Sequence, residues 1–317
     1  QVKELIPGLN EMDIPVFIKN DRVEAYDIDN GEKIYRFILK GISELEVCQI
    51  YGSDITKRVK AEQKVLRQQE AITDSIHYAR RIQQAVLPDI QLLKDNFADS
   101  FVLFKPRDIV SGDFYWMTKK KDKIIVVAAD STGHGVPGAF MSMLGVSFLN
   151  EIVNTNDCCA DLLLNLLRDK VKSALSQSGK GTDDGMDLAM IIYDPKEKQI
   201  HFAGAYNHFY LVRNGKLLVT KADRMPIGNH LKDSESFTNH LLDVQKGDVI
   251  YLFSDGYPDQ FDAANKVKFT VKRMKELFLA HYQKPMAEQR EVFDKTIEDW
   301  RGDNPQLDDV LLMGLRL

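Results

Sequence analysis

Acidic residues stand at four places where an apolar segment begins or ends. Asp130 closes one apolar run, Asp255 closes another, Asp308 and Asp309 precede a third, and Asp113 lies in a Ser-Gly-Asp-Phe sequence. Carboxylates that are buried together repel one another, and hard divalent cations with oxygen ligands are the usual means of neutralising them. The chain has no histidine and cysteine cluster with zinc spacing. The pattern therefore predicts a magnesium or manganese site.

Each of these places also has a simpler interpretation. An Asp-Gly pair at the end of a strand is usually a turn, because aspartate binds its own backbone and glycine adopts positive φ. Three of the four places have a glycine beside or near the aspartate. The recurrence of the pattern within one stretch of chain favours a shared site over four independent turns.

The composition is that of an ordinary globular protein with a weak acidic balance. The chain has 317 residues, and its 42 basic and 47 acidic side chains give a formal charge of −5. At roughly 150 residues per domain, the length predicts about two domains. The acidic balance argues against nucleic acid as the main partner. The odd set of Cys48, Cys158 and Cys159 indicates a reducing compartment and no disulfide framework.

We expect a cytoplasmic location and no membrane-spanning segment in this chain, because its longest apolar stretches fall short of the roughly 20 residues that a spanning helix needs. The chain begins at Gln1 rather than at methionine. We therefore expect a fragment or processed product of a longer protein, whose missing part could hold a membrane anchor.

The chain changes character twice. Within residues 14–54 the pattern is that of β structure, and Asn30-Gly31 is a strong hairpin signal. From Lys57 to Val86 apolar residues recur at helical steps on one face, which Gln69 and Gln83 interrupt. Two interpretations stay open for this helix, a short coiled coil between subunits or a helix packed on its own domain. The apolar positions are Ile72, Ile76, Ala79, Ile82 and Val86, with Val65 further back.

From about residue 98 strand and helix patterns alternate, which predicts an α+β layered domain with sheets covered by helices. Several strands are joined by short polar turns such as Asn214-Gly215. The expected strands are Ser100–Lys105, Lys123–Ala129, Asp187–Tyr193, Gln199–Ala203, His208–Arg213, Asp248–Phe253 and Val310–Arg316, and the expected helices are about 137–153, 160–176, 271–281 and 286–300.

The acidic motifs occur in the order and approximate spacing of the metal-dependent protein serine/threonine phosphatases. They are Ser111-Gly112-Asp113-Phe114, Asp130-Ser131-Thr132-Gly133-His134-Gly135, Phe253-Ser254-Asp255-Gly256 and Asp308-Asp309-Val310. Over about residues 75–317 the chain resembles most the bacterial branch of stage II sporulation phosphatase E and the stress-response sigma-factor regulators. The resemblance implies a two-sheet β-sandwich flanked by helices, with two manganese or magnesium ions at one end.

The resemblance also implies which residues would hold the ions. Asp130 would bridge both, Asp113 and the Ser131 carbonyl would complete the first site, and Asp255 with Asp308 would hold the second. A water or hydroxide between the ions would attack phosphorus in line, because two cations acidify water and neutralise charge on the entering and leaving oxygens.

A third, weaker ion is found in some family members near the segment that holds Asp183 and Asp184 here. Either residue could be a ligand, and a solvated acidic turn is an equal alternative. Asp187 follows in the same segment but opens an apolar strand pattern, so its role stays open.

Two further side chains are candidates for the reaction itself. Arg107 resembles the phosphate-binding arginine of the eukaryotic members, and a guanidinium suits bidentate phosphate binding. Its alternative is a solvated loop arginine after Pro106. His134 could protonate the leaving group, since histidine titrates near neutrality. Thr132, however, holds the position of the eukaryotic family's acid histidine, which speaks against that role.

The front of the chain resembles part of a sensor. Residues 47–62, with Asp54-Ile55-Thr56, resemble the end of a PAS domain, where the last strand continues through a cap into a signalling helix. Residues 75–88 look like the helix that precedes the catalytic core in the bacterial branch, which implies a switch that acts through dimerisation. The expected domains are 1–56 (PAS-like, C-terminal part), 57–88 (linker helix) and 89–317 (phosphatase).

We therefore expect a Mn/Mg-dependent phosphatase that acts on phosphoserine or phosphothreonine of a bacterial regulatory protein of the anti-sigma-factor antagonist type. We expect a homodimer through the linker helix. The alternatives are a catalytically degenerate phosphatase fold that only binds partners and a metal phosphohydrolase that acts on a small molecule. The retained Asp113, Asp130, Asp255 and Asp308 favour the enzyme.

Overall fold

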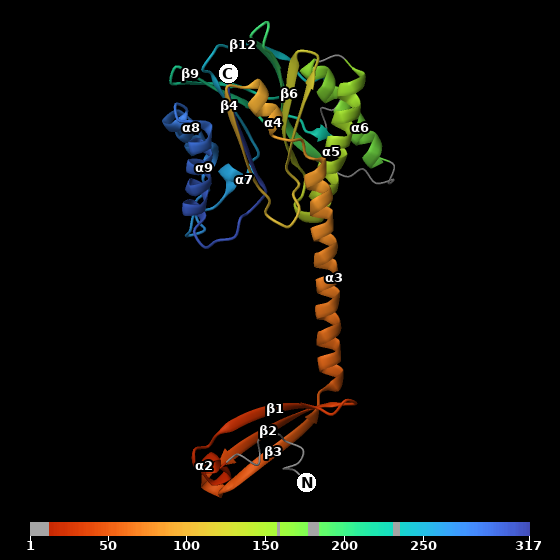
Figure 1. Cartoon of the computed structure of the whole chain (residues 1–317), viewed down its shortest axis with the longest axis vertical. Helices are drawn as coiled ribbons and strands as arrows, with labels where there is room; N and C mark the ends of the chain where they lie inside the picture. The colour runs from red at the N-terminus through yellow and green to blue at the C-terminus, as the bar shows by residue number, and fades with distance from the viewer. Residues whose placement is uncertain (1–12, 157–158, 177–183, 231–234) are drawn as a thin grey trace. The chain divides into compact units, whose positions relative to one another are not determined.

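The computed structural model describes residues 13–156, 159–176, 184–230 and 235–317, and it divides into two compact units. The first unit is Gln1–Ser75 and the second is Ile76–Leu317. Helix α3 (Thr56–Val86) contains the division, so the C-terminal part of this helix belongs to the second unit. Figure 1 labels the elements along the chain.

Two antiparallel sheets form the centre of the second unit (Figure 1). One has the strand order β10-β9-β13-β14-β4, and the other has the order β12-β8-β7-β6-β5 with β11 paired to β7. A buried cluster joins apolar side chains of both sheets, including Ile191 and Leu252. The strands are β4 (Asp99–Lys105), β5 (Phe114–Lys120), β6 (Lys123–Ser131), β7 (Gly185–Asp194), β8 (Gln199–Ala205), β9 (Phe209–Arg213), β10 (Lys216–Thr220), β11 (Ile227–Gly228), β12 (His240–Asp243), β13 (Val249–Phe253) and β14 (Val310–Arg316).

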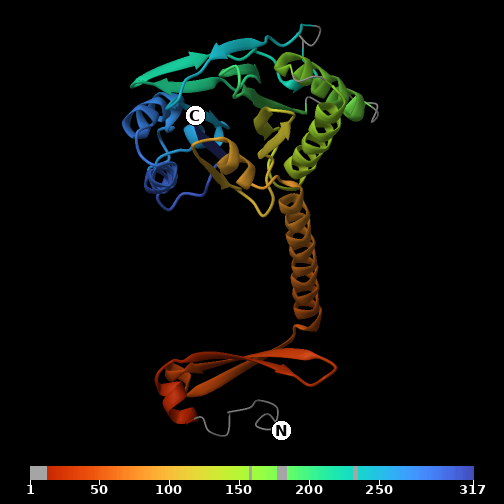
Figure 2. The same cartoon turned by 45° about the horizontal axis from the view of Figure 1, so that its top comes forward.

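Helices cover the outer face of each sheet, as Figure 2 shows for α5 and α6 on one side and α8 and α9 on the other. Because β6 meets the core between the sheets with one face and α5 with the other, its segment 124–129 is fully buried. The predicted two-sheet sandwich flanked by helices is therefore confirmed. The helices of this unit besides α3 are α4 (Gln91–Asn96), α5 (Gly135–Thr155), α6 (Ala160–Ser176), α7 (Gly256–Asp259), α8 (Thr270–His281) and α9 (Met286–Arg301).

The strands and helices expected from residue 98 onward are present, and their bounds shift by a few residues at most. Asn214 and Gly215 both have positive φ, 50° and 74°, as a two-residue hairpin turn requires. Four strands were not expected, β5, β10, β11 and β12. β10 and β12 lie at sheet edges with half of their side chains exposed, so their apolar pattern is weak.

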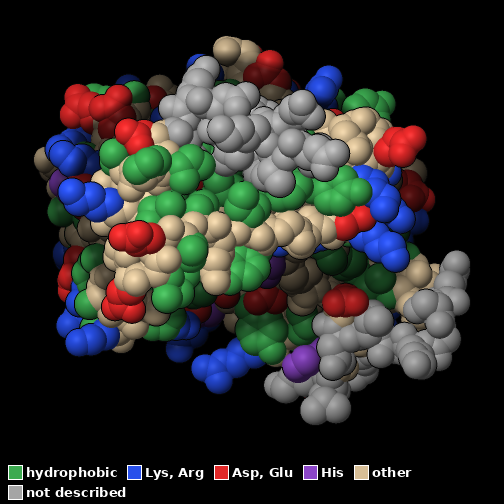
Figure 3. Space-filling view, turned by 90° about the horizontal axis from the view of Figure 1, so that it is seen from below, with side chains coloured by type: hydrophobic (Ala, Val, Ile, Leu, Met, Phe, Trp, Pro, Cys, Tyr) green, Lys and Arg blue, Asp and Glu red, His purple; other side chains and the backbone are tan. Residues whose placement is uncertain are grey.

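From residue 13 onward, the first unit is a small antiparallel sheet with one short helix against it and the N-terminal part of α3. Strands β1 (Val23–Asp29), β2 (Ile34–Ile42) and β3 (Val47–Asp54) pair in that order, and a 3-10 turn (Ser43–Leu45) joins the last two. Helix α2 (Ile14–Lys19) packs on the sheet through Phe17, which contacts the cluster of Leu39. Figure 3, seen from below, shows a band of hydrophobic side chains with charged side chains around it. The likeness of this unit to a PAS domain stays a prediction.

The β interpretation of residues 14–54 is wrong at its start, where helix α2 lies. Asp13 caps this helix, because its carboxylate accepts the N–H of Val16 at 3.1 Å. Pro15 occupies the first turn, where a helix has no use for the missing N–H. At the hairpin, only Gly31 has positive φ, and residues 30–33 form the loop, because the Asn30 side chain accepts the N–H groups of the two residues that follow Gly31.

Two expectations about helices have mixed outcomes. Helix α5 is long and apolar enough to cross a membrane by length and composition, which the predicted run lengths did not allow for. Half of its most apolar window is buried, and it packs on the sheet, as a core helix does. The helix expected from Lys57 to Val86 is confirmed as α3, and Asp54 accepts the N–H of Thr56 at its start.

Candidate active site

Aspartates from both sheets lie together at one end of the sandwich. Asp130 is in β6 and pairs in register with Asp187 of β7, while Asp113 directly precedes β5. Asp255 follows β13 and its backbone N–H points to Asp130 Oδ2 at 3.5 Å, which connects the two sheets. Asp308 directly precedes Asp309 and β14. Four of the predicted site residues are thus brought together.

The carboxylates raise one another's pKa, as groups that lie close together do. Burial raises the pKa of Asp113 well above its ordinary value, and the charge of Asp130 adds to the rise. Burial likewise raises the pKa of Asp130, with contributions from Asp255 and Asp187. The pKa of Asp187 rises to about 7, because of burial and the charge of Asp255. Each of these acids would stay ionised more readily beside a cation.

The loop before Asp113 is held from two sides, and the first hold comes from β14. The Asp309 carboxylate accepts the backbone N–H of Arg107 and the backbone N–H of Gly112, both at 2.7 Å. A Cβ on Gly112 would lie 2.5 Å from the Gly133 carbonyl, so only glycine allows this loop to approach the loop after Asp130. The glycine of the Ser-Gly-Asp motif is therefore required because the loops that carry Asp113 and Asp130 pack closely together here.

The second hold comes from helix α3. Gln83 is buried, and its amide donates to the Ser111 carbonyl at 2.7 Å and to Ser142 Oγ of α5 at 2.9 Å. Its side-chain oxygen accepts the Ser111 N–H at 3.1 Å. The glutamine that interrupts the apolar seam of α3 thus fixes the residue two positions before Asp113. The packed-helix interpretation holds for this end of α3, whereas Val65 and Ile72 are exposed.

Gly256, which follows Asp255, is required for close packing and not for the turn that the sequence suggested. Gly256 begins α7 with ordinary backbone angles, and a Cβ on it would lie 1.9 Å from the Asp309 carbonyl. The Asp-Gly pair here brings the end of β13 against the start of β14. Ser254 completes this contact, because its hydroxyl accepts the N–H of Leu311 at 3.0 Å.

The donor set fits hard divalent cations. Asp113 Oδ2 is buried with no hydrogen-bond partner in the described part of the chain, which is the state of an oxygen that a cation would satisfy. The group supplies carboxylate oxygens and the Ser131 backbone, with no cysteine or histidine among them. Within the described residues no three acidic, histidine or cysteine side chains already stand at metal-holding distance. Metal ligation by this group stays a proposal.

The other predicted residues lie around this group. Arg107 is exposed, and only its backbone N–H contacts Asp309. His134 precedes α5 and pairs through Nδ1 with Asp108 at 2.8 Å, with both side chains about half exposed. Asp183 lies outside the described residues. Asp184 is exposed, and its carboxylate lies 3.5 Å from the Thr132 hydroxyl.

Three contributors were missed or left open by the sequence analysis. Asp187 was left open, but its register partner is Asp130, which the alternation of β6 and β7 could have suggested. Asp309 was noted only as part of a motif, yet it holds the Asp113 loop. Gln83 was noted as a polar break in an apolar face, and such a break in a partly buried helix is the signal of a buried hydrogen-bonded group.

Comparison with known proteins gives the chain a family. The model of the stage II sporulation protein E (SpoIIE) family matches residues 120–317. Phosphoserine phosphatase RsbU of Bacillus subtilis is 28% identical over 195 residues, which are 59% of this chain and 54% of RsbU. The chain thus spans about half the length of this curated relative.

Solved structures agree with the family match. The SiaA-PP2C domain of Pseudomonas aeruginosa matches with a TM-score of 0.72 and 31% identity, over 78% of this chain and 98% of that domain. The PP2C phosphatase domain of SpoIIE from B. subtilis, with a fragment of its regulatory domain, matches with a TM-score of 0.58 and 17% identity, over 69% of this chain and 63% of that one, and supports the fold alone. The chain therefore belongs to the SpoIIE family, and its second unit is a phosphatase domain of the PP2C type.

Proposed function

We propose that this chain is a manganese- or magnesium-dependent phosphatase that hydrolyses phosphoserine or phosphothreonine in a bacterial regulatory protein. The observation that carries the proposal is the group of Asp113, Asp130, Asp255 and Asp308 at the end of a PP2C-type sandwich, in which Asp113 is buried. The name of the relative, phosphoserine phosphatase RsbU, supports the substrate class. An anti-sigma-factor antagonist is the partner type we propose, because the motifs resemble a branch that contains sigma-factor regulators.

The residues that would hold the two ions form two overlapping sets. Asp113, Asp130 and the Ser131 carbonyl would hold one ion, and Asp130, Asp255 and Asp308 the other. When bound, two such ions acidify a water and neutralise charge on the phosphate. The carboxylates keep fixed positions, because the Asp309 carboxylate holds the loop before Asp113 and the close packing at Gly256 holds the segment after Asp255.

Outside the cage, two exposed groups are suited to the substrate. Arg107 lies on the loop that Asp309 holds, and its exposed guanidinium is of the type that binds phosphate. His134 is oriented by Asp108 through Nδ1, which leaves Nε2 free to give a proton to the leaving serine oxygen. We propose Arg107 for phosphate binding and His134 as the proton donor.

For regulation, we propose that helix α3 acts on the site through Gln83, the contact nearest to Asp113. The apolar face of α3 is exposed at Ile72, Ile82 and Val86, which supports a second copy of this chain as its partner. A change in the packing of that face would move Gln83 and with it the Ser111 loop. The proposed coupling therefore runs from α3 to the Asp113 loop, because Gln83 is hydrogen-bonded to Ser111.

Release of phosphate from an aryl phosphate with Mn²⁺, Mg²⁺ or a chelator tests the activity. Asp130→Asn should lower the rate by at least about 100-fold, because it removes charge from both metal positions. The matched control is Asp122→Asn, an exposed acid paired with Lys196, whose rate should stay within about twofold of wild type. Equal rates for Asp130→Asn and wild type would sink the assignment.

A second assay separates the enzyme from a degenerate binding module. Wild type that retains a phosphoprotein without releasing phosphate, at any manganese concentration, would be such a module. An active wild type whose Asp255→Asn variant retains the same phosphoprotein supports a protein substrate. Wild type that cleaves aryl phosphates but no phosphoprotein would point to a small-molecule phosphohydrolase.

A further inference from the structure

Next to the Arg107 loop lies a hollow most of whose lining has no part in the proposed chemistry. It has a volume of about 460 Å³ and lies between the Arg107 loop and the segment that leads to Asp308. That volume is within the roughly 300–1,000 Å³ of sites that hold small ligands. We call it the amide pocket, because four of its lining residues are the amides Gln260, Asn265, Asn304 and Gln306.

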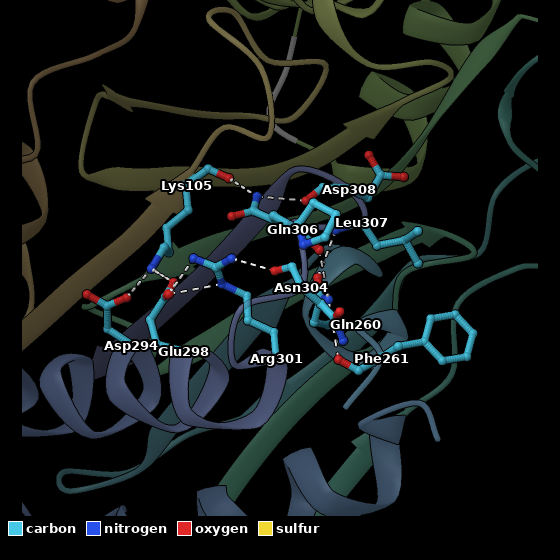
Figure 4. Close-up of polar contacts among 11 residues, drawn as sticks. Lys105, Gln260, Phe261, Asp294, Glu298, Arg301, Asn304, Gln306, Leu307 and Asp308 are labelled. Atoms are coloured by element: carbon cyan, nitrogen blue, oxygen red, sulfur yellow. Dashed lines mark hydrogen bonds and ion pairs between the residues drawn. The ribbon is translucent and has the colours of Figure 1, made fainter. Parts of the chain in front are cut away.

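The wall of the amide pocket is rigid. Gln260 is buried, and its side chain accepts the Leu307 N–H at 2.8 Å and donates to the Pro305 carbonyl at 3.3 Å. The Gln306 amide donates to the carbonyls of Lys105 and Asp308, both at 2.7 Å. Figure 4 shows these contacts converging on the segment before Asp308.

Ion pairs also hold the segment before Asp308 in place. Arg301 donates to the Asn304 carbonyl at 2.7 Å and pairs with Glu298, which also pairs with Lys105 of β4 (Figure 4). The Asn304 amide in turn donates to the Asp262 carbonyl at 2.8 Å. A pocket with such fixed walls binds without the cost of ordering them, which is the property of a preorganised site.

The lining indicates the chemistry of the ligand. The Asn265 amide and the side-chain oxygens of Asn304 and Gln306 have no hydrogen-bond partner among the described residues, so they can bind the N–H and C=O groups of an extended polypeptide. Phe261 and the exposed Leu307 add apolar surface for an uncharged side chain. The charged members, Arg107 and Asp108, stand on the loop shared with the acidic group, so they mark the side from which the phosphate would enter.

We propose that the amide pocket binds the uncharged stretch of substrate polypeptide next to the phosphorylated residue. This inference rests on the proposed function, and it assigns to the chain a subsite that distinguishes a phosphoprotein from a small phosphate ester. Arg107 would hold the phosphate while the amide pocket holds the flanking backbone, so the two contacts together fix the direction of the bound chain.

Two variants remove pocket contacts without touching the acidic group. Asn265→Gly keeps the positive φ of 54° that this position has, and removes the amide. Leu307→Ala removes apolar surface but keeps the backbone N–H that Gln260 accepts. Matched controls are Asn214→Gly, at a φ of 50°, and Leu218→Ala, at a similarly exposed leucine of β10.

The test compares kcat/KM for three probes at saturating Mn²⁺. They are a short phosphoserine peptide with alanine and leucine flanks, N-acetyl phosphoserine methylamide, and an aryl phosphate. Wild type should prefer the peptide over the capped amino acid by about tenfold, the scale of a few pocket contacts. In Asn265→Gly/Leu307→Ala that preference should disappear, while the aryl phosphate rate stays within about twofold. The control pair should keep the preference.

The other outcomes overturn one claim or the other. The pocket assignment is wrong if wild type shows no preference, if it cleaves the aryl phosphate but not the peptide, or if the double variant keeps the wild-type preference. It is also wrong if the double variant loses all three activities equally, because these residues would then only support the Asp308 segment. Absence of metal-dependent aryl phosphate hydrolysis in wild type overturns the proposed function instead.

Discussion

Two loops in this domain end at an acid of the site, and both depend on a buried glutamine. Gln83 holds the loop before Asp113, and Gln260 holds the segment before Asp308. Each glutamine side chain accepts one backbone N–H of its loop and donates to at least one carbonyl. The local solution is the same on the two sheets, although the loops have no sequence in common.

The two glutamines differ in where they come from. Gln260 follows α7 within the phosphatase domain, and its own carbonyl accepts the Phe269 N–H and the Trp300 indole N–H. Gln83 belongs to α3, a helix whose other half is in the first unit. One loop is thus held by the domain itself, and the other by an element that continues outside the domain. The difference indicates that a regulatory signal could reach the Asp113 loop through α3 without changing the Asp308 side of the site.

Replacing Gln83 should have the largest effect. Gln83→Met keeps the shape of the side chain but leaves the fully buried Ser111 N–H without a partner, which costs about 1–3 kcal/mol of unfolding free energy. The Mn²⁺ concentration for half-maximal activity should rise, because Asp113 loses its support. Urea unfolding and a manganese titration measure the two effects. The exposed neighbour in Gln84→Met is the control, and an equal loss there would remove the special role of Gln83.

Replacing Gln260 should lower the free energy of unfolding less than replacing Gln83. Gln260→Met frees the Leu307 N–H, but Leu307 is 40% exposed, so water can replace the lost acceptor and the cost should be about 1 kcal/mol. Activity should fall through Asp308 and should not respond to changes in α3. The exposed Gln283→Met serves as control. A Gln260 variant less stable than the Gln83 variant would reverse the comparison.

The sequence predicted the acids better than the supports that hold them. Asp113, Asp130, Asp255 and Asp308 could be found because each ends or begins an apolar run. The layered α+β class follows from the same runs, whereas the two-sheet sandwich was implied by the family resemblance. The supports could not be found that way, because the partner of Gln83 lies 28 residues away and that of Gln260 lies 47 away. No periodicity marks such a pair. Helix α2 was missed for a different reason, since its Asp-Ile-Pro cap is short and lies inside a β-like pattern.

Charges on the exposed face of α3 should have a smaller effect on stability and a selective effect on activity. Ile82→Glu changes a side chain that is 41% exposed, so the monomer should lose no more than about 0.5 kcal/mol. If α3 pairs with a second copy, the mutation should abolish dimers in sedimentation experiments and change the manganese requirement as Gln83→Met does. Ile76→Glu should act alike, and Gln84→Glu should not.

Double variants test whether Ile82 and Gln83 act on the same loop. Ile82→Glu and Gln83→Met should not add in their effect on the manganese requirement, because both act on the Ser111 loop, whereas Ile82→Glu and Gln260→Met should add. Unchanged oligomer and activity in both isoleucine variants would show that α3 is only a packed helix.

The smallest expected effect comes from the ion pairs of Glu298 with Arg301 and Lys105, which support the segment before Asp308. Burial alone would raise the pKa of Glu298, but hydrogen bonds from Arg301 and Lys105 outweigh it and hold that pKa below its ordinary value. A carboxyl with a depressed pKa stabilises the fold above its unfolded pKa, and the contribution is lost as the pH falls through the folded pKa. Because Glu298 is 37% exposed, the contribution is at most about 1 kcal/mol. The difference in unfolding free energy between wild type and Glu298→Gln should therefore be present at pH 7 and vanish in acid. A difference that persists in acid would mean that Arg301 holds the Asn304 segment without help from its ion pair, and the Asp308 side would then be fixed by hydrogen bonds alone.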